Sequence, residues 1–520
     1  MERKQTRKIE KTIKNIWPKV RKKHLFPQIP TPIVSEGSSE KVAIEMKAKQ
    51  IIINPLFLEK LQKKMPEEEV VEALLDHGIT HYTYCPWDFT THLFLYQEAK
   101  KVLKDKELTK ISTGYFLDVV SDTYCVKGRG TKLPELYKNM EKEGLDQVIS
   151  SLYQNIWGID LGTSNFSEVT RRLSRIPYLD RAKWGESIKR FSRVIKPFLE
   201  KEEDKKKQNP MGNHSVESYG QEEVDKGLRD FAFRVKSLKE FKEVISDFTE
   251  ELSDMGYGTE GGMGRGKSMS FDADILFYQK LAENYTLPIR KLPLEGSGSL
   301  YPHSHSPWEV GKPVQDIDIW TSFGKIMPGI TKIWQRKEGE ILKEKEKVPD
   351  CIIVIDSSGS MQNPRIKLSY SVLGAMCAAS SYLKAGAKVA AYNFSDAEAG
   401  GKEVLNFTSK RWEIYKVLCR YFGGGTNLSF NEIENLRKET NPDIFLITDM
   451  QITNLEKVID YFLSVPNRIT AVYIGENKHV IRFKQRVEKR QNISFFGVKK
   501  KEDIPKIILG KIKEYLRANL

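Results

Sequence analysis

Three oxygen-bearing side chains, Asp356, Ser358 and Ser360, alternate directly after the apolar run 352–355. The run predicts a buried parallel strand, and alternate residues of the extended loop that follows project to the same side. The three side chains can therefore place hard oxygen atoms on one small cation. Oxygen ligands at the end of a strand are those that Mg²⁺ and Mn²⁺ prefer in proteins.

Two later segments complete this pattern. The glycine-rich loop 423–427 carries Thr426, and a second apolar run, 444–447, ends in Thr448 and Asp449. Open parallel sheets bind ligands at the carboxyl ends of their strands, where these loops meet. The sequence therefore predicts a Mg²⁺ or Mn²⁺ site formed by five residues: Asp356, Ser358, Ser360, Thr426 and Asp449.

A DxSxS segment followed by a threonine and then an aspartate resembles the metal-ion-dependent adhesion site of von Willebrand factor A (VWA) domains. The resemblance runs from about residue 347 to the end of the chain. It implies a doubly wound, mainly parallel, Rossmann-like sheet, and a cation with an open position that an Asp or Glu of a protein partner fills. No nucleophile–base pair lies beside these residues, so we expect binding rather than catalysis there.

The DSSGSM, GGGT and TD motifs also resemble those of intracellular prokaryotic VWA proteins that accompany MoxR-type AAA+ ATPases. By this resemblance the partner is an AAA+ ATPase, and the pair would remodel a client protein or insert metal into it. The sequence itself contains no sign of the ATPase.

A second candidate site lies near the N-terminus. His77 and His81 stand four residues apart in a segment that predicts a helix, so both imidazoles leave one face about a turn apart. That spacing allows two histidines to share one Zn²⁺. Cys85 and His92 are further candidate ligands. The alternative is a polar pair that hydrogen-bonds to neighbouring tyrosines, Tyr82 and Tyr84.

A strand that ends in Asn-Pro, followed by a helix with His-x-x-x-His, resembles the core of zincin metallopeptidases. The resemblance implies a third ligand from a later helix, Asp118 by position, with Asp122 behind a histidine; the sequence leaves the choice between the two acids open. Zincins carry a general-base Glu where this chain has Gly78, and Gly can neither bind metal nor accept a proton. The predicted metal site makes a zinc-dependent hydrolase or peptidase the alternative function. Gly78 weighs against enzymatic activity, which the sequence leaves open.

The overall composition favours a chain with several domains and no membrane span. The 520 residues carry a net charge of +14, and no run approaches the ~18 apolar residues that a membrane helix needs. Five scattered cysteines form no CxxC pair, which is typical of a reducing compartment. We therefore expect a cytoplasmic protein.

Residues 1–23 hold ten lysines and arginines against two glutamates. Apolar residues recur there at helical spacing, so the segment predicts a basic amphipathic helix interrupted near Pro18. Two interpretations follow: a surface helix docked on its own protein through the isoleucines, or a contact to nucleic acid or an acidic membrane surface.

Two other motifs are weaker. Residues 261–268 satisfy the P-loop pattern GxxxxGK[ST], but the segment before them predicts a helix rather than a buried strand, which favours a glycine-rich hinge. His303 and His305 would share one face of an extended segment, where loop polarity is a simpler interpretation than metal binding.

The predicted fold is α/β, with a C-terminal VWA-like sheet, a mainly helical zincin-like N-terminal domain and an irregular β-rich connector. The expected divisions are a basic segment and linker at 1–45, the zincin-like domain at 46–200, a charged helix and hinge at 201–270, the connector at 271–346 and the VWA domain at 347–520.

Overall fold

The computed structural model describes most of the chain and divides it into two units. The described residues are 2–35, 42–45, 50–163, 167–201, 211, 218–257, 272–285, 300–312, 314–322, 326–338, 348–438, 441–498 and 503. One unit comprises Met1–Asn284 with Gln362–Ser369, and the other comprises Tyr285–Met361 with Tyr370–Leu520. Among the described residues, every helix is too short or too polar to traverse a lipid bilayer.

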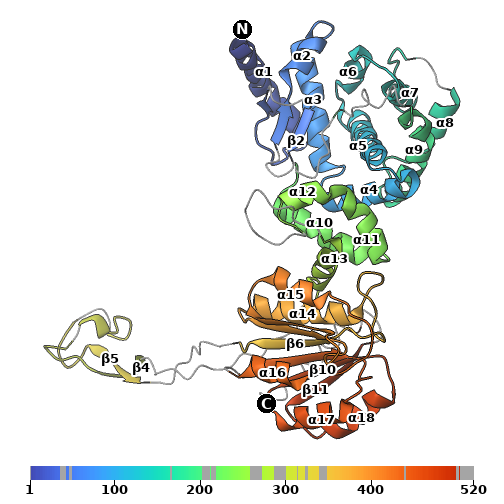
Figure 1. The fold of residues 1–520 in the computed structure, drawn as a ribbon. Helices are drawn as coiled ribbons and strands as arrows, with labels where there is room; N and C mark the ends of the chain where they lie inside the picture. Colours follow the sequence, from blue (N-terminus) through green and yellow to red (C-terminus); the bar gives the residue numbers. More distant parts are fainter. Residues whose placement is uncertain are drawn as a thin grey trace. The chain divides into compact units, whose positions relative to one another are not determined.

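The N-terminal unit is mainly helical (Figure 1). Its small sheet has the order β1-β3-β2, with β1 parallel and β2 antiparallel to the central strand β3. Its strands and α-helices are β1 (Ile33–Val34), β2 (Val42–Glu45), β3 (Gln50–Ile53), α1 (Glu2–Lys23), α2 (Pro55–Gln62), α3 (Glu67–Thr83), α4 (Phe89–Leu103), α5 (Lys106–Arg129), α6 (Leu133–Asn139), α7 (Leu145–Trp157), α8 (Ser167–Ser174), α9 (Trp184–Leu199), α10 (Gln221–Arg234), α11 (Leu238–Ile245), α12 (Thr249–Asp254) and α13 (Ala273–Ala282).

Helix α1 is docked on its own unit, as one of the two interpretations predicted. Ile9, Ile13, Ile16 and Val20 are buried, and α1 packs against α3. The interruption expected near Pro18 is wrong, because α1 continues through it. Burial of the apolar stripe offsets the cost of a proline inside the helix, which is about 3 kcal/mol.

Other boundaries in this unit differ from the expected ones. The stretch 25–45, expected to be a loop or linker, contains β1 and β2. The charged helix expected over 221–254 is broken after α10, where Ser237 caps a new helix by accepting a hydrogen bond from the Glu240 N–H at 3.2 Å. The chain turns extended at Val235, which ends α10, and Ser237 then begins α11.

The C-terminal unit is built on a six-stranded sheet of order β11-β10-β9-β6-β7-β8. All neighbouring strands are parallel except the edge pair β7–β8. The strands are β6 (Cys351–Asp356), β7 (Val389–Phe394), β8 (Lys402–Thr408), β9 (Asp443–Thr448), β10 (Ile469–Ile474) and β11 (Ile493–Val498). This confirms the predicted α/β class and the mostly parallel sheet.

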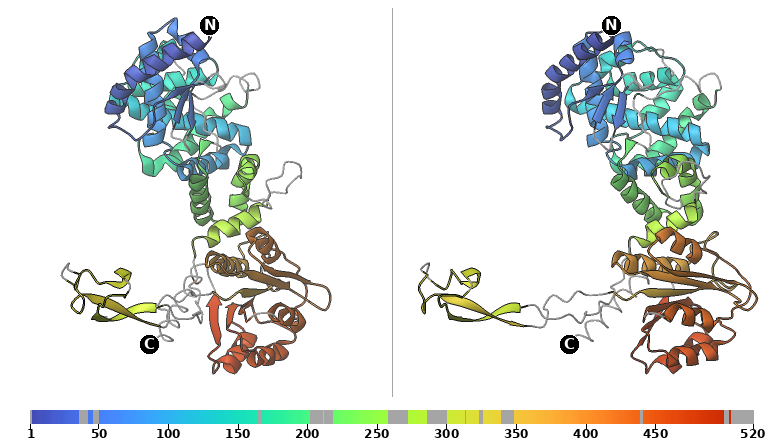
Figure 2. Two further views of the ribbon diagram at one scale, coloured as in Figure 1. Left: turned by 90° about the vertical axis from the view of Figure 1, so that its left-hand side faces the viewer. Right: turned by 60° about the vertical axis from the view of Figure 1, so that its left-hand side comes forward.

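Helices cover both faces of this sheet. They are α14 (Tyr370–Lys384), α15 (Arg411–Leu418), α16 (Phe430–Arg437), α17 (Leu455–Ser464) and α18 (Lys478–Val487). Ile352 and Val354 of β6 share a buried apolar cluster with α16, α17 and α18, and α14 and α15 pack on the opposite face. Figure 2 shows the strands between these two layers of helices.

Two helices of this unit differ from expectation, and a third lies outside the described residues. The first long helix was expected from 366 but begins at Tyr370; residues 362–369 form turns and irregular structure and belong to the N-terminal unit. Helix α18 was not predicted. The helix expected over 504–516 lies outside the described residues.

Part of the connector is an antiparallel hairpin of β4 (Leu300–Pro307) and β5 (Lys332–Glu338). His305 of β4 contacts Asp318 (Nε2 to Oδ2, 2.7 Å), and its ring lies tilted against that of Trp334 at a centroid distance of 3.8 Å. The strand-like stretch 289–292 lies outside the described residues.

Candidate functional site

The predicted oxygen site lies where the C-terminal sheet changes direction. Strands β6 and β9 are adjacent and parallel, and the chain proceeds from β6 to β7 and β8 on one side and from β9 to β10 and β11 on the other. The loops that follow two such strands run in opposite directions, which creates a crevice at the carboxyl ends of the strands. Asp356 ends β6 and Thr448 ends β9, so both stand at this crevice.

Hydrogen bonds hold the loop after β6 in a fixed conformation. Asp356 accepts from the Thr448 hydroxyl at 2.7 Å through Oδ2 and from the Ser358 N–H at 2.9 Å through Oδ1. The hydroxyls of Ser358 and Ser360 lie 3.2 Å apart. Asp356 and Ser358 are buried, whereas Ser360 is exposed. The three predicted ligands therefore form one cluster that reaches from the interior to the surface.

The glycine-rich loop lies against this cluster. Gly359 N–H donates to the Gly424 carbonyl at 2.9 Å, and Gly423 N–H donates to the Ser357 carbonyl at 2.9 Å. A Cβ on Gly359 would lie 3.1 Å from the Gly424 oxygen, and Gly423 and Gly424 have φ of 70° and 77°. Only glycine adopts these conformations readily at such close approach.

The other two predicted ligands follow in the adjoining loops. Thr426 stands two residues after Gly424, and its carbonyl accepts from the Thr453 N–H at 2.8 Å, which ties it to the loop after β9. Asp449 accepts from the backbone and side-chain nitrogens of Gln451 at 2.9 and 3.0 Å. The three predicted loops thus lie together at the carboxyl ends of the central strands.

The electrostatics of Asp356 fit a cation site. Burial raises the pKa of its carboxyl to about 6; the hydrogen bonds from Thr448 and Ser358 oppose this rise, and the nearby Asp449 carboxylate adds to it. The groups that shift this pKa most include no cationic side chain. A buried carboxylate with a second carboxylate in its vicinity and serine hydroxyls beside it offers oxygen donors of the kind that suit Mg²⁺ or Mn²⁺.

Sequence reasoning missed two residues that support this site. Thr448 was seen only as the end of a strand, yet its hydroxyl fixes the Asp356 carboxylate. Ser395, which follows β7, donates to the carbonyls of Gly423 and Gly425 and so holds the glycine loop. The signal for Ser395 was its place at the carboxyl end of a third strand next to β6.

The histidine site of the N-terminal unit also comes together. The Nε2 atoms of His77 and His81 lie 3.2 Å apart. Asp118 Oδ1 on α5 lies 3.4 Å from the His81 Nε2 and 3.8 Å from the His77 Nε2. All three side chains are buried, and their ligand atoms lie within 4.8 Å of one another.

Partners behind the histidines fix which ring nitrogens face the centre. His81 Nδ1 lies 2.7 Å from the Cys85 carbonyl oxygen, which can only accept, so this nitrogen carries the proton. His77 Nδ1 lies 2.7 Å from Asp122 Oδ1, and the hydroxyls of Tyr137 and Tyr153 donate to Asp122 Oδ2 at 2.6 and 3.0 Å.

Both imidazoles therefore turn Nε2 towards the other ring and towards Asp118. A cation between the two nitrogens and the Asp118 carboxylate, either a proton or a metal ion, would satisfy all three groups. Two imidazoles and a carboxylate, with the imidazoles oriented from behind, are a donor set that suits Zn²⁺. In this arrangement Asp118 faces the histidine pair and Asp122 lies behind it. The alternative partners, Tyr82 and Tyr84, instead donate to the carbonyls of Gln50 and Leu179.

No replacement for the missing zincin base comes from the helix itself. A Cβ on Gly78 would point at Ile51 of β3, with the Ile51 Cδ1 only 3.0 Å away. Asp76 contacts Lys23 and His24 instead. Cys85 supplies its carbonyl to His81, and His92 Nδ1 contacts the Tyr219 hydroxyl at 3.1 Å, so neither side chain belongs to the group.

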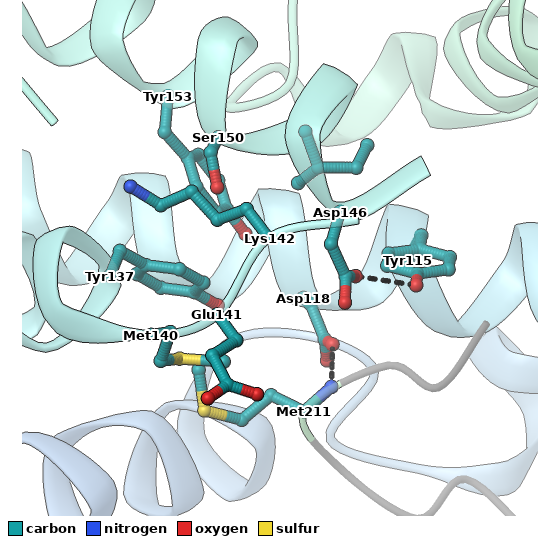
Figure 3. A pocket seen from close by; sticks show the side chains of 11 residues that line it. Tyr115, Asp118, Tyr137, Met140, Glu141, Lys142, Asp146, Ser150, Tyr153 and Met211 are labelled. Atoms are coloured by element: carbon teal, nitrogen blue, oxygen red, sulfur yellow. Dashed lines mark hydrogen bonds between the residues drawn. The ribbon is translucent and has the colours of Figure 1, made fainter. Parts of the chain in front are cut away.

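A small pocket lies beside Asp118 (Figure 3). The Met211 N–H donates to Asp118 Oδ2 at 2.7 Å, and the Tyr115 hydroxyl donates to Asp146 at 2.6 Å. Its other lining residues are Tyr137, Met140, Glu141, Lys142, Ile149, Ser150 and Tyr153. The pocket therefore brings polar, charged and aromatic groups next to a predicted metal ligand.

The weaker motifs gain little support. The P-loop match at 261–268 lies outside the described residues, and the segment before it is helical (α11 and α12), as expected. The side chain of His303 is not described, and His305 pairs with Asp318.

Neither the models of known protein families nor the curated protein sequences give a match to this chain.

Proposed function

We propose that the C-terminal unit binds a protein partner by capturing one of its acidic side chains through a Mg²⁺ ion. The observation that carries the proposal is the position of Asp356, Ser358 and Ser360 at the switch point of the sheet, with the loops of Thr426 and Asp449 hydrogen-bonded around them. When bound, the ion would supply an open coordination position for a carboxylate.

The chain's own residues divide this task. Asp356 and Asp449 provide negative charge, and the hydroxyls of Ser358, Ser360 and Thr426 provide neutral oxygen atoms. A site with so few carboxylates leaves the bound ion with residual positive charge, which favours an acidic partner. The resemblance to VWA proteins adds a MoxR-type AAA+ ATPase as the proposed partner, acting with this chain in client remodelling or metal insertion.

The first test is metal binding followed by partner capture. Mn²⁺ serves as a paramagnetic probe, and we expect it to bind the wild-type chain and to be lost in Asp356→Ala and Thr426→Ala. The exposed acid Asp460 of α17 gives the control Asp460→Ala. In lysate, an AAA+ ATPase should be retained by the wild-type chain with Mg²⁺ and released by chelator. Retention by folded Asp356→Ala would refute the proposal.

The histidine group supports a second candidate function, a zinc-dependent hydrolase. The observation that favours it is the convergence of His77, His81 and Asp118 next to an open pocket. The same pocket carries the carboxylates of Glu141 and Asp146, which provide acids from outside α3 where Gly78 provides none. In this candidate the bound ion would polarise a carbonyl and activate water.

This second candidate is tested by peptide hydrolysis under zinc-replete conditions. Activity should vanish with chelator and in His77→Ala, and should fall by about 10²–10⁴-fold in Glu141→Gln if that acid is the base. Lys138→Gln, a change on the neighbouring helix α6, is the control. The absence of turnover by the zinc-loaded chain would leave the histidine group as a structural site.

A further inference from the structure

A second buried group of metal-binding side chains lies in the N-terminal unit. It consists of His24, Asp76 and Cys125, whose ligand atoms lie within 4.8 Å of one another. Each comes from a different element: His24 directly follows α1, Asp76 lies on α3 and Cys125 lies on α5. All three are less than one-tenth exposed. Residues 24, 76 and 125 are far apart in sequence, so only the fold assembles them.

This group is separate from the histidine site. Asp76 and His77 are successive residues of α3, so their side chains leave the helix about 100° apart. Asp76 points to His24 and Lys23, whereas His77 points to His81 and Asp122. The two groups share no residue.

We propose that His24, Asp76 and Cys125 bind a second transition-metal ion, Zn²⁺, that fastens the end of α1 to α3 and α5. A nitrogen, an oxygen and a sulfur ligand form a mixed set that Zn²⁺ accepts in tetrahedral geometry, with water as the fourth ligand. A hard ion such as Mg²⁺ does not favour a thiolate, so the sulfur selects the metal.

The contacts of Asp76 leave one oxygen directed at this site. Its Oδ2 contacts the Lys23 ammonium at 2.5 Å, and Lys23 also contacts Glu72 at 2.8 Å. Its Oδ1 lies 2.9 Å from the His24 Nε2. Binding would replace the proton between these two atoms by the ion and move the imidazole proton to Nδ1. The Cys125 thiol would lose its proton to solvent, so the dication adds only one positive charge to this group.

Helix α1 itself places His24 at this site. The His24 N–H donates to the Val20 carbonyl at 3.1 Å, so His24 continues the last turn of the helix on the face of the buried Val20. Leu25 and Phe26, which follow, have positive φ of 62° and 54° and exposed side chains, so the helix ends directly after this ligand.

Cobalt provides a probe that distinguishes this site from the histidine site. A thiolate bound to Co²⁺ gives an intense near-ultraviolet charge-transfer band, and the histidine site contains no cysteine side chain. The full chain is loaded with Co²⁺ in excess Mg²⁺, which occupies the oxygen site. We expect the band in the wild-type chain, and two zinc ions per chain after loading with Zn²⁺ instead.

Matched variants then locate the sites. Cys125→Ser and His24→Gln should each lose the band and one zinc ion. His81→Ala should lose one zinc ion but keep the band, and Cys419→Ser, which removes a buried thiol of the other unit, should keep both. His24→Gln serves as the second variant if Cys125→Ser does not fold. Absence of the band from the folded wild-type chain, or its persistence in folded Cys125→Ser, would overturn the proposal.

Discussion

Asp122 Oδ1 lies 2.7 Å from the Nδ1 of His77. Asp122 stands one turn after Asp118 on the same helix, α5. The i and i+4 positions of α5 thus serve the front and the back of the same imidazole. Asp118 faces Nε2 with His81, and Asp122 orients the ring from the other side. Two short segments, one of α3 and one of α5, therefore provide all four side chains: His77, His81, Asp118 and Asp122.

The first prediction concerns this carboxylate. Asp122→Asn should lower the zinc affinity of the histidine site by about 10–100-fold, because the amide holds the His77 ring less firmly and makes it less basic. Competition with a chromophoric chelator measures the change. Tyr137→Phe removes only one hydrogen bond to Asp122 and should have a smaller effect. Equal affinity in the wild type and Asp122→Asn would show that Asp122 has no part in metal binding.

The second prediction concerns Gly78. Alanine stabilises a helix interior by about 1 kcal/mol relative to glycine, but a Cβ here meets three atoms of the buried Ile51 at 3.0–3.2 Å. We expect Gly78→Ala to destabilise the N-terminal unit by about 1 kcal/mol. In an Ile51→Val background, which removes the nearest atom but keeps the two carbons at 3.2 Å, the same change should be less destabilising. Urea unfolding of the four proteins measures this coupling, and additive effects would contradict it.

Gly78 also explains how far the resemblance to zincins extends. The Cβ of a Glu at this position would point at Ile51 of β3 and not at the histidine pair. We therefore expect that Gly78→Glu alone does not produce peptide hydrolysis. Helical spacing predicted the pairing of His77 and His81, whereas Asp118 and Asp122 came from the resemblance to zincins, which left the choice between the two acids open. The group of His24, Asp76 and Cys125 could not be predicted, because its members meet only through the packing of three elements.

The oxygen site was equally accessible from the sequence, since each predicted residue follows a strand or a glycine loop whose position in a parallel sheet is regular. Interruptions of helices were harder to predict. Pro18 does not break α1, because the apolar stripe beside it is buried, whereas Ser237 does begin a new helix inside a continuous charged pattern. Tertiary packing decided the first case and a local cap decided the second.

The third prediction follows from the docking of α1. Ile13→Ala should destabilise the N-terminal unit by about 2–4 kcal/mol, because Ile13 is almost completely buried. Lys14→Ala, on the exposed face, should change stability by less than about 0.5 kcal/mol. Thermal unfolding measures both. Similar stability of the two variants would mean that α1 is not held by its apolar stripe.

The fourth prediction concerns the basic residues of α1. Lys8, Lys19 and Lys23 pair with Glu67, Glu72 and Asp76 of α3, so part of the positive charge is neutralised within the unit. We expect retention on DNA to be weak and to disappear at moderate salt. Salt-resistant retention that is lost with residues 1–23 would instead support nucleic-acid binding.

The fifth prediction concerns the pH dependence set by Asp356. Burial raises its pKa from 3.8 to about 6, so between these pH values the folded chain binds the proton more tightly than the unfolded chain. Stability without metal should therefore fall as the pH rises from about 4 to about 6. At pH 7, Asp356→Asn should stabilise the metal-free C-terminal unit by about 1–3 kcal/mol, because it removes a buried charge. Hydrogen exchange in peptides from β6 and β9 measures this locally.

Mg²⁺ should make the wild-type C-terminal unit more stable than that of Asp356→Asn, the reverse of the order expected without metal. The wild-type site gains an ion that compensates the buried carboxylate, whereas Asp356→Asn binds little metal and gains no protection. Below pH 6, protonation of Asp356 competes with the ion, so the Mg²⁺ affinity of the wild-type chain should fall by up to about tenfold per pH unit. Asp460→Asn, an exposed acid on α17, is the control and should behave like the wild type. Asp356→Asn that is less stable than the wild type without metal would show that the carboxylate stabilises the loop. The inference that the buried charge lowers stability in favour of metal binding would then be wrong.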